Sequence, residues 1–170
     1  PLIAGESIEN LYRLHHKSGA AVTVQTVELP DGAHYGRVVR DAEGRVQDVV
    51  QTKDAAGHPD ILAIREINTG AYCFEAAFLR QALEQLTVSP VTGEIYLTDM
   101  IPLARKHGRS VEALLDPDWP NLLGINSRKE LAEATRTCKM RINAEHMAAG
   151  VTLVDPESTY IGPLVSIGRD

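Results

Sequence analysis

The chain has 170 residues, of which 17 are Lys or Arg and 23 are Asp or Glu, and its formal net charge is −6. Hydrophobic residues make up 44% and charged residues 24% of the chain, a balance typical of a folded globular protein rather than an intrinsically disordered one. No stripe of basic residues indicates nucleic-acid binding, and no apolar run is long enough to span a membrane.

The two cysteines and the six histidines do not predict a disulfide or a zinc site. Cys73 and Cys138 lie far apart and form no C-x-x-C motif, so we expect two reduced thiols in a cytoplasmic protein. The histidines lack the H-x-x-x-H spacing of zinc enzymes. The chain begins at Pro1 without a methionine or a signal peptide, which leads us to expect a fragment of a longer protein.

The first half of the chain predicts one helix and several strands. A helix is expected at residues 6–17, with Ser7 as its N-cap and Gly19 as the residue that ends it. Strands are expected at residues 20–29, 35–40, 46–52 and 65–75, with a polar loop at residues 54–60. Gly44 can adopt the positive φ that the hairpin loop between the second and third strands requires.

The second half of the chain predicts several short elements followed by one long helix. The elements expected before it are helices at residues 74–86 and 98–107, a strand at residues 111–115 and a turn at residues 116–120. Ser127 and Glu130 form a capping box, from which a helix of about 34 Å continues to Ala149 and stops at Gly150. Its apolar stripe is narrow, which favours a helix that joins two bodies over one buried in a core.

The residue pattern changes after Gly150. Ile161 and Ile167 are each followed by glycine and lie six residues apart, which is the period of a parallel β-helix. Two copies alone do not distinguish such a repeat from a chance recurrence of Ile-Gly. The pattern therefore predicts the first rungs of a solenoid only in combination with other evidence.

Seven short motifs follow one another along nearly the whole chain. They are Tyr35-Gly36-Arg37, Lys53-Asp54-Ala55, Glu66-Ile67-Asn68-Thr69-Gly70, Gly93-Glu94-Ile95-Tyr96-Leu97-Thr98-Asp99, Gly124-Ile125-Asn126-Ser127-Arg128, Ala149-Gly150-Val151-Thr152 with Asp155-Pro156, and Ile167-Gly168-Arg169-Asp170. Each motif is weak alone, but their order closely resembles that of the bacterial bifunctional N-acetylglucosamine-1-phosphate uridyltransferases and glucosamine-1-phosphate N-acetyltransferases.

The resemblance implies an α/β fold of three parts. Residues 1–126 would be the sugar-binding, C-terminal half of a Rossmann-like nucleotidyltransferase (nucleotide-diphospho-sugar transferase) domain. Residues 127–149 would be the linker helix. Residues 150–170 would begin a left-handed parallel β-helix, the acetyltransferase domain, through which the family forms homotrimers.

The resemblance also implies a set of sugar-binding residues. They are Gly36, Gln51, Asn68, Tyr96 and Thr98. An amide such as Asn68 offers both donors and an acceptor to sugar hydroxyls, and a glycine lets the backbone approach a ligand. Gln51 departs from the usual glutamate, which weakens this contact or replaces a charged acceptor by a neutral one. Arg37 is interpreted as a structural or rim residue.

Each of these residues also has a purely structural interpretation. Asn68 can cap a turn before its strand, Gly36 can be an ordinary strand glycine, and Gln51 a surface strand residue. Tyr96 and Thr98 can simply form the entry to a helix.

The resemblance implies one magnesium ligand and no catalytic side chain within the chain. Asn126 would bind Mg²⁺ through its carboxamide oxygen, in keeping with the preference of this ion for oxygen ligands; alternatively, it caps the following helix. The family's metal-binding aspartate would precede Pro1, and its Gly-rich nucleotide loop has no counterpart in the sequence. We therefore expect the chain alone to be inactive.

The reaction implied is Mg²⁺-dependent transfer of a uridylyl group from UTP to N-acetylglucosamine 1-phosphate. It would yield UDP-N-acetylglucosamine for cell-wall synthesis. The fused activity would acetylate glucosamine 1-phosphate with acetyl-CoA. Two alternatives remain: another sugar-nucleotide pyrophosphorylase of the same superfamily, or a non-catalytic module for sugar-phosphate binding or assembly.

Overall fold

The computed structural model describes residues 3–117, 119–122 and 124–170. It divides into two compact units, which we call the sheet unit (Ile3–Trp119) and the helix unit (Pro120–Asp170). The short helix α5 (Trp119–Leu122) begins at this division. The turn expected at residues 116–120 includes Asp118, which lies outside the described residues.

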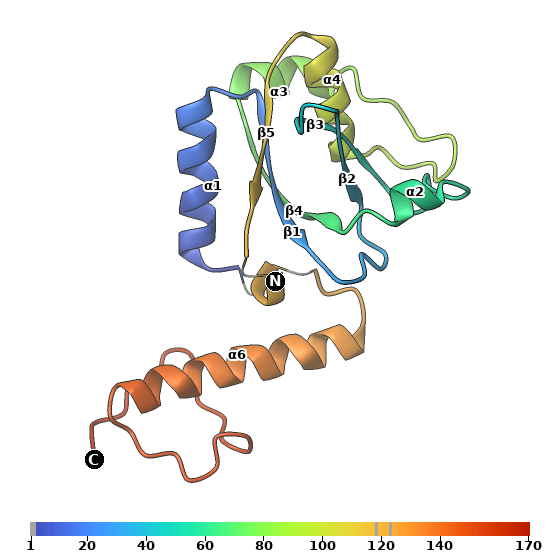
Figure 1. Ribbon diagram of the computed structural model, residues 1–170. Helices are drawn as coiled ribbons and strands as arrows, with labels where there is room; N and C mark the ends of the chain where they lie inside the picture. The colour runs from blue at the N-terminus through green and yellow to red at the C-terminus, as the bar shows by residue number, and fades with distance from the viewer. Residues whose placement is uncertain (1–2, 118, 123) are drawn as a thin grey trace. The chain divides into compact units, whose positions relative to one another are not determined.

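A five-stranded mixed sheet is the centre of the sheet unit (Figure 1). Its strands are β1 (Val22–Glu28), β2 (Arg37–Arg40), β3 (Val46–Val50), β4 (Glu66–Phe74) and β5 (Val111–Leu115), in the spatial order β3-β2-β4-β1-β5. β1 is antiparallel to β4 and parallel to β5, while β2 pairs antiparallel with both β3 and β4. The predicted mixed α/β class is confirmed; the Rossmann-like assignment stays a prediction.

Helices pack on both faces of this sheet. They are α1 (Gly5–Ser18), α2 (Pro59–Leu62), α3 (Ala76–Leu83) and α4 (Met100–Lys106), the last preceded by a 3₁₀ turn, η1 (Leu97–Asp99). Val22 and Val24 of β1 belong to the core that α3 and α4 cover. Because side chains alternate along a strand, Thr23 and Gln25 face the other way, where His15 of α1 contacts Thr23 with 2.8 Å between Nδ1 and Oγ1.

The structure corrects the predicted role of Ser7. α1 begins at Gly5 with Ala4 as its N-cap, so Ser7 lies inside the helix, and it is buried. Its hydroxyl donates to Oδ2 of the buried Asp116 at 2.9 Å. A buried carboxylate needs donors more than an exposed helix end needs a cap; since Asp116 is distant in the sequence, local spacing gave no sign of it.

Smaller differences concern the lengths of the helices. The loop expected at residues 54–60 contains the start of α2, which begins with Pro59 at its first position. The helix expected at residues 74–86 is shorter and ends after Leu83. The helix expected at residues 98–107 is divided into η1 and α4.

In the helix unit, α6 (Arg128–Ala148) begins at the predicted capping box. Glu130 N donates to Ser127 Oγ at 3.2 Å, and Ser127 N donates to Glu130 Oε2 at 2.8 Å. The helix ends at Ala148 with Ala149 as its C-cap, and the next residue, Gly150, has a φ of 96°. Fully buried Asn143 of α6 donates through Nδ2 to the backbone oxygens of Pro156, at 2.8 Å, and Thr159, at 2.9 Å.

The described tail, residues 150–170, contains turns but no strand. It closes on itself where Asp170 N donates to Gly150 O at 3.2 Å. The left-handed β-helix therefore stays a prediction.

Neither Cys73 nor Cys138 forms a disulfide. Within the described residues, none of the helices combines the length and the apolar character needed to cross a membrane.

Candidate functional site

Gly36 and Asn68 lie side by side where β2 and β4 meet. Asn68 N donates to Gly36 O at 3.0 Å, one step from the pairing of Arg37 with Ile67. A Cβ on Gly36 would lie 3.1 Å from Cγ1 of Val49 and 3.5 Å from the side-chain amide of Gln51. The tight distance is the one to Val49, whereas the Gln51 amide lies at ordinary van der Waals distance from the place where a side chain on Gly36 would begin.

Gln51 continues this group of residues toward η1. Its Nε2 donates to Oγ1 of the buried Thr98 at 3.3 Å. Asn68, Gly36, Gln51 and Thr98 are therefore neighbours in space, although they come from four different segments of the chain. The sequence singled out each of these residues separately, and the structure brings the four together; we call them the polar cluster.

Tyr96 lies beside the polar cluster in a pocket of about 250 Å³ that Gln51 also lines. The Tyr96 hydroxyl forms a 2.5 Å hydrogen bond with Thr92 Oγ1. Three carboxylates, Asp48, Asp54 and Asp99, line the same pocket. Burial raises the pKa of Asp48, and burial together with the charges of Asp48 and Asp54 raises the pKa of Asp99. This pocket therefore favours hydroxyl-bearing groups over anions.

Asn68 also closes a local turn, but inside β4 and not before the strand as the alternative interpretation had it. Its Oδ1 accepts a hydrogen bond from Gly70 N at 2.8 Å, and Gly70 has a φ of 87°. Since a carboxamide has two N–H donors and a second acceptor lone pair, this turn does not exhaust its hydrogen-bonding capacity. The turn fixes the amide oxygen and thereby orients the donors of the side chain.

Arg37 is neither exposed nor part of a rim. Its side chain is buried, with 3% of the residue exposed, and its partners among the described residues are backbone carbonyls. The interpretation as a rim residue is therefore wrong, and the structural interpretation holds. Sequence reasoning missed its burial because an arginine is usually exposed.

Asn126 lies in the helix unit, in an exposed loop before α6. Its backbone N donates to Glu130 Oε2 at 2.5 Å. Within residues 3–117, 119–122 and 124–170, no group of three or more His, Cys, Asp or Glu side chains is arranged to hold a metal ion. A single carboxamide oxygen suits Mg²⁺ only as one ligand among several, so these residues alone do not make a magnesium site.

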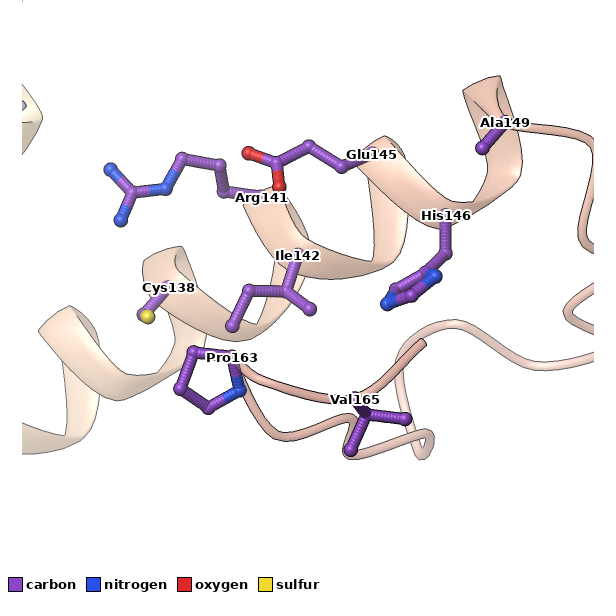
Figure 2. A pocket seen from close by; sticks show the side chains of 8 residues that line it. All are labelled: Cys138, Arg141, Ile142, Glu145, His146, Ala149, Pro163 and Val165. Carbon is purple, nitrogen blue, oxygen red and sulfur yellow. The ribbon is translucent and has the colours of Figure 1, made fainter. Parts of the chain in front are cut away.

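A second pocket, of about 400 Å³, belongs to the helix unit (Figure 2). Figure 2 shows Ile142 and His146 of α6 directed toward Pro163 and Val165 of the tail. None of the residues predicted to bind the sugar or magnesium lines this pocket. This pocket lies where the tail packs along α6, and it contains no residue of the polar cluster.

Comparison with known proteins bears on the family that the motif order predicts. No family model matches the chain. Over all 170 residues, however, it is 45% identical to the bifunctional protein GlmU of Lactobacillus delbrueckii subsp. bulgaricus. The chain is homologous to part of GlmU. The identity is 44% with GlmU of Lactobacillus gasseri and 42% with GlmU of Oceanobacillus iheyensis, again over the whole chain.

These relatives confirm the predicted resemblance and also limit it. The chain spans about 36% of the length of the Lactobacillus GlmU proteins. More than half of each relative is therefore outside the comparison. The likeness to GlmU shows that these 170 residues share their ancestry with part of that protein.

Proposed function

We propose that the sheet unit supplies the sugar-binding side of a uridyltransferase site that takes N-acetylglucosamine 1-phosphate as its acceptor. The observation that supports this most is the polar cluster, in which Asn68 is bonded to Gly36, Gln51 is bonded to Thr98, and Gly36 and Gln51 lie next to each other. The half-buried carboxamides of Asn68 and Gln51, beside the buried Gly36 and Thr98, offer both donors and acceptors, which suits a polyhydroxylated ring.

The charges near the polar cluster favour one orientation of the ligand. Asp48, Asp54 and Asp99 line the pocket that Gln51 and Tyr96 share. A phosphate in that pocket would be repelled by the carboxylates, whereas sugar hydroxyls can donate to them. In the proposed complex the ring and its acetamido group therefore lie on the Tyr96 side, and the phosphate points away from the three aspartates.

In the proposed reaction a phosphate oxygen of the sugar phosphate attacks the α-phosphate of UTP, and pyrophosphate leaves. The chain's own residues bind and orient the acceptor, which is a large part of catalysis in phosphoryl transfer. Asn126 would supply one oxygen ligand to Mg²⁺, together with ligands from the nucleotide and from elsewhere. When bound, this ion would neutralise phosphate charge.

For the whole protein we propose the two activities and the assembly that the resemblance implies. The product would be UDP-N-acetylglucosamine for the cell wall, and the second activity would transfer an acetyl group from acetyl-CoA to glucosamine 1-phosphate. The tail from Gly150 onward would begin the left-handed β-helix of a cytoplasmic homotrimer.

A titration followed by NMR tests the proposed ligand on the chain as it is. N-acetylglucosamine 1-phosphate, added to the isotope-labelled protein, is expected to shift the amide signals of Gly36, Asn68 and Thr98 in one saturable curve. UDP-N-acetylglucosamine should shift the same signals, because it carries the same sugar.

Two comparison ligands define the outcome of this titration. Glucose 1-phosphate, which lacks the acetamido group, should bind more weakly; equal binding would favour a pyrophosphorylase with a different sugar. Inorganic phosphate controls for non-specific binding of an anion. If the sugar phosphate shifts no signal of the polar cluster at millimolar concentration, the proposed function is wrong.

A further inference from the structure

We propose that Arg37 is the positioning residue of the polar cluster: it fixes the loop of residues 32–36, and through this loop it sets where Gly36 meets Asn68 and Gln51. This inference rests on the proposed function for its ligand but not for its geometry. Arg37 itself does not belong to the polar cluster, and it acts through the backbone of its neighbours.

The guanidinium group of Arg37 gathers backbone carbonyls from two segments. Nη1 donates to the oxygens of Gly32, at 2.8 Å, and Tyr35, and Nη2 donates to the oxygen of Ala33 at 3.0 Å. Nε donates to the oxygen of Leu62, at the end of α2, at 3.4 Å. Three carbonyls of one short loop thus converge on a single planar cation, which also ties the loop to α2.

The lack of a side chain on Gly32 leaves room for the guanidinium group of Arg37. A Cβ built on Gly32 would lie 2.4 Å from Cζ and 2.6 Å from Nε of Arg37, far inside contact distance with a buried group. The φ of Gly32 is not in the left-handed region, so backbone freedom does not account for the glycine here. The close approach of the guanidinium accounts for it, and this supports the pairing of the two residues independently of the hydrogen bonds.

The loop of residues 32–36 is strained at one residue and is held by several bonds besides those of Arg37. Ala33 has a φ of 42°, a left-handed conformation that costs energy for any residue with a side chain. Two local bonds are present, from Ala33 N to Asp31 Oδ1 at 2.9 Å and from Tyr35 N to Gly32 O at 3.0 Å. The C-terminal end of the loop is also held from outside, since Thr52 Oγ1 donates to Tyr35 O and Asn68 N donates to Gly36 O, both at 3.0 Å. At its N-terminal end the Arg37 guanidinium links the carbonyls of Gly32 and Ala33 to α2.

The partners of Arg37 explain why arginine is needed. Among the described residues it forms no ion pair, so its charge is balanced by carbonyl dipoles alone. A buried charge of this kind is costly, and it persists only if all its donors are satisfied in a fixed geometry. Lysine has a compact ammonium group that cannot reproduce the planar fork, so Arg37→Lys removes the geometry while keeping the charge.

Two variants disturb this contact from opposite sides. Arg37→Lys changes the cation. Gly32→Ala keeps the arginine but fills the space that its guanidinium group occupies. Arg40→Lys is the matched control, because Arg40 lies on the same strand, β2, but pairs with the Glu66 carboxylate, with 2.7 Å between Arg40 Nη2 and Glu66 Oε1. All three variants are measured for unfolding by urea, so that loss of stability is separated from loss of position.

Two readouts are expected to move together in Arg37→Lys and Gly32→Ala. The Kd for N-acetylglucosamine 1-phosphate should rise by about tenfold, since a displacement on the order of 1 Å weakens a positioned site strongly. Hydrogen exchange at Asn68 N, which donates to Gly36 O, should become about tenfold faster. Arg40→Lys should change each readout by less than about twofold.

The two readouts keep this inference separate from the proposed function. If the unsubstituted chain does not bind the sugar phosphate, the proposed function fails, and exchange at Asn68 N still decides about Arg37. Unchanged exchange in both Arg37→Lys and Gly32→Ala would overturn the positioning role. Faster exchange at Asn68 N without any change in the Kd would also overturn the positioning role, because Arg37 would then support the fold and not the site.

Discussion

The Gln51 side chain donates a hydrogen bond to Thr98 Oγ1 across 3.3 Å, which links the end of β3 to η1. A glutamate, the residue expected here from the resemblance, could not donate in this way; it would instead accept a bond from the Thr98 hydroxyl. The neutral amide keeps a fourth carboxylate away from Asp48, Asp54 and Asp99, which line the neighbouring pocket. Compared with a glutamate, Gln51 is therefore a weaker acceptor for sugar hydroxyls but causes less repulsion among the carboxylates of the protein.

Gln51→Glu is therefore expected to strengthen sugar binding and to make it depend on pH. A charged acceptor forms a stronger bond than a neutral one by about 1 kcal/mol, which corresponds to a roughly fivefold lower Kd. The neighbouring carboxylates raise the pKa of the new glutamate, so the gain is largest at high pH and is lost as the pH falls. Calorimetric titrations at two pH values measure this; a Kd that rises at high pH would contradict it.

Asn68 can be tested for its two roles separately. Asn68→Ala removes both the sugar contact and the bond from Gly70 N, so both the Kd and the stability should suffer. Asn68→Asp keeps an acceptor for Gly70 N but loses the two donors. If the donors bind the sugar, both variants weaken the binding free energy by about 1 to 3 kcal/mol, and only Asn68→Ala is less stable. Normal binding by Asn68→Asp would mean that the residue serves the turn alone.

Asp99 predicts a stability that depends on pH. Burial first, and then the charges of Asp48 and Asp54, raise the pKa of Asp99 in the folded protein. The folded state thus holds a proton that the unfolded state releases, and stability falls as the pH rises from the unfolded value of about 4 through the raised pKa. Asp99→Asn should stabilise the protein at neutral pH and have no such effect at low pH.

Urea unfolding at several pH values measures the effect of Asp99→Asn. No side-chain cap would be lost, because Asp99 makes none at the start of α4. Asp60→Asn, at an exposed position in the first turn of α2, is the control and should give no gain at neutral pH. A gain for Asp99→Asn that is equal at all pH values would show that its charge is not the cause.

The buried contact between Ser7 and Asp116 predicts a loss of stability. Asp116 Oδ2 accepts from Ser7 Oγ at 2.9 Å and from Gln25 Nε2 at 2.9 Å. Ser7→Ala removes one donor from a buried carboxylate and should lower the free energy of unfolding by about 1 to 3 kcal/mol. Ser110→Ala, at an exposed position, should change it by less than about 0.5 kcal/mol. Equal effects of the two variants would contradict this account.

The sequence predicted most of the secondary structure because its signals are local. Val22 and Val24 with their β-branched neighbours identified β1, and the Ser127–Glu130 capping box identified the start of α6. Ser7 was misjudged because its partner, Asp116, is distant in the chain. The rungs of a β-helix depend on neighbouring coils, so the Ile-Gly repeat alone does not determine the structure of the tail.

The polar cluster was predicted as separate residues but not as an arrangement. Asn68 and Gly36 meet only through the register between β2 and β4, and Gln51 meets Thr98 only through the packing of η1 against β3. Such long-range pairings leave no signal in a single sequence. The burial of Arg37 was missed for a similar reason, since its partners are carbonyls, which every residue has.

A crystal structure of the chain with N-acetylglucosamine 1-phosphate tests the central claim most directly. The account predicts the sugar ring beside the polar cluster, with the Asn68 side-chain amide within hydrogen-bond distance of ring hydroxyls and the phosphate directed away from Asp48 and Asp99. A sugar bound elsewhere on the chain, or a phosphate seated in the pocket between Asp48 and Asp99, would contradict it.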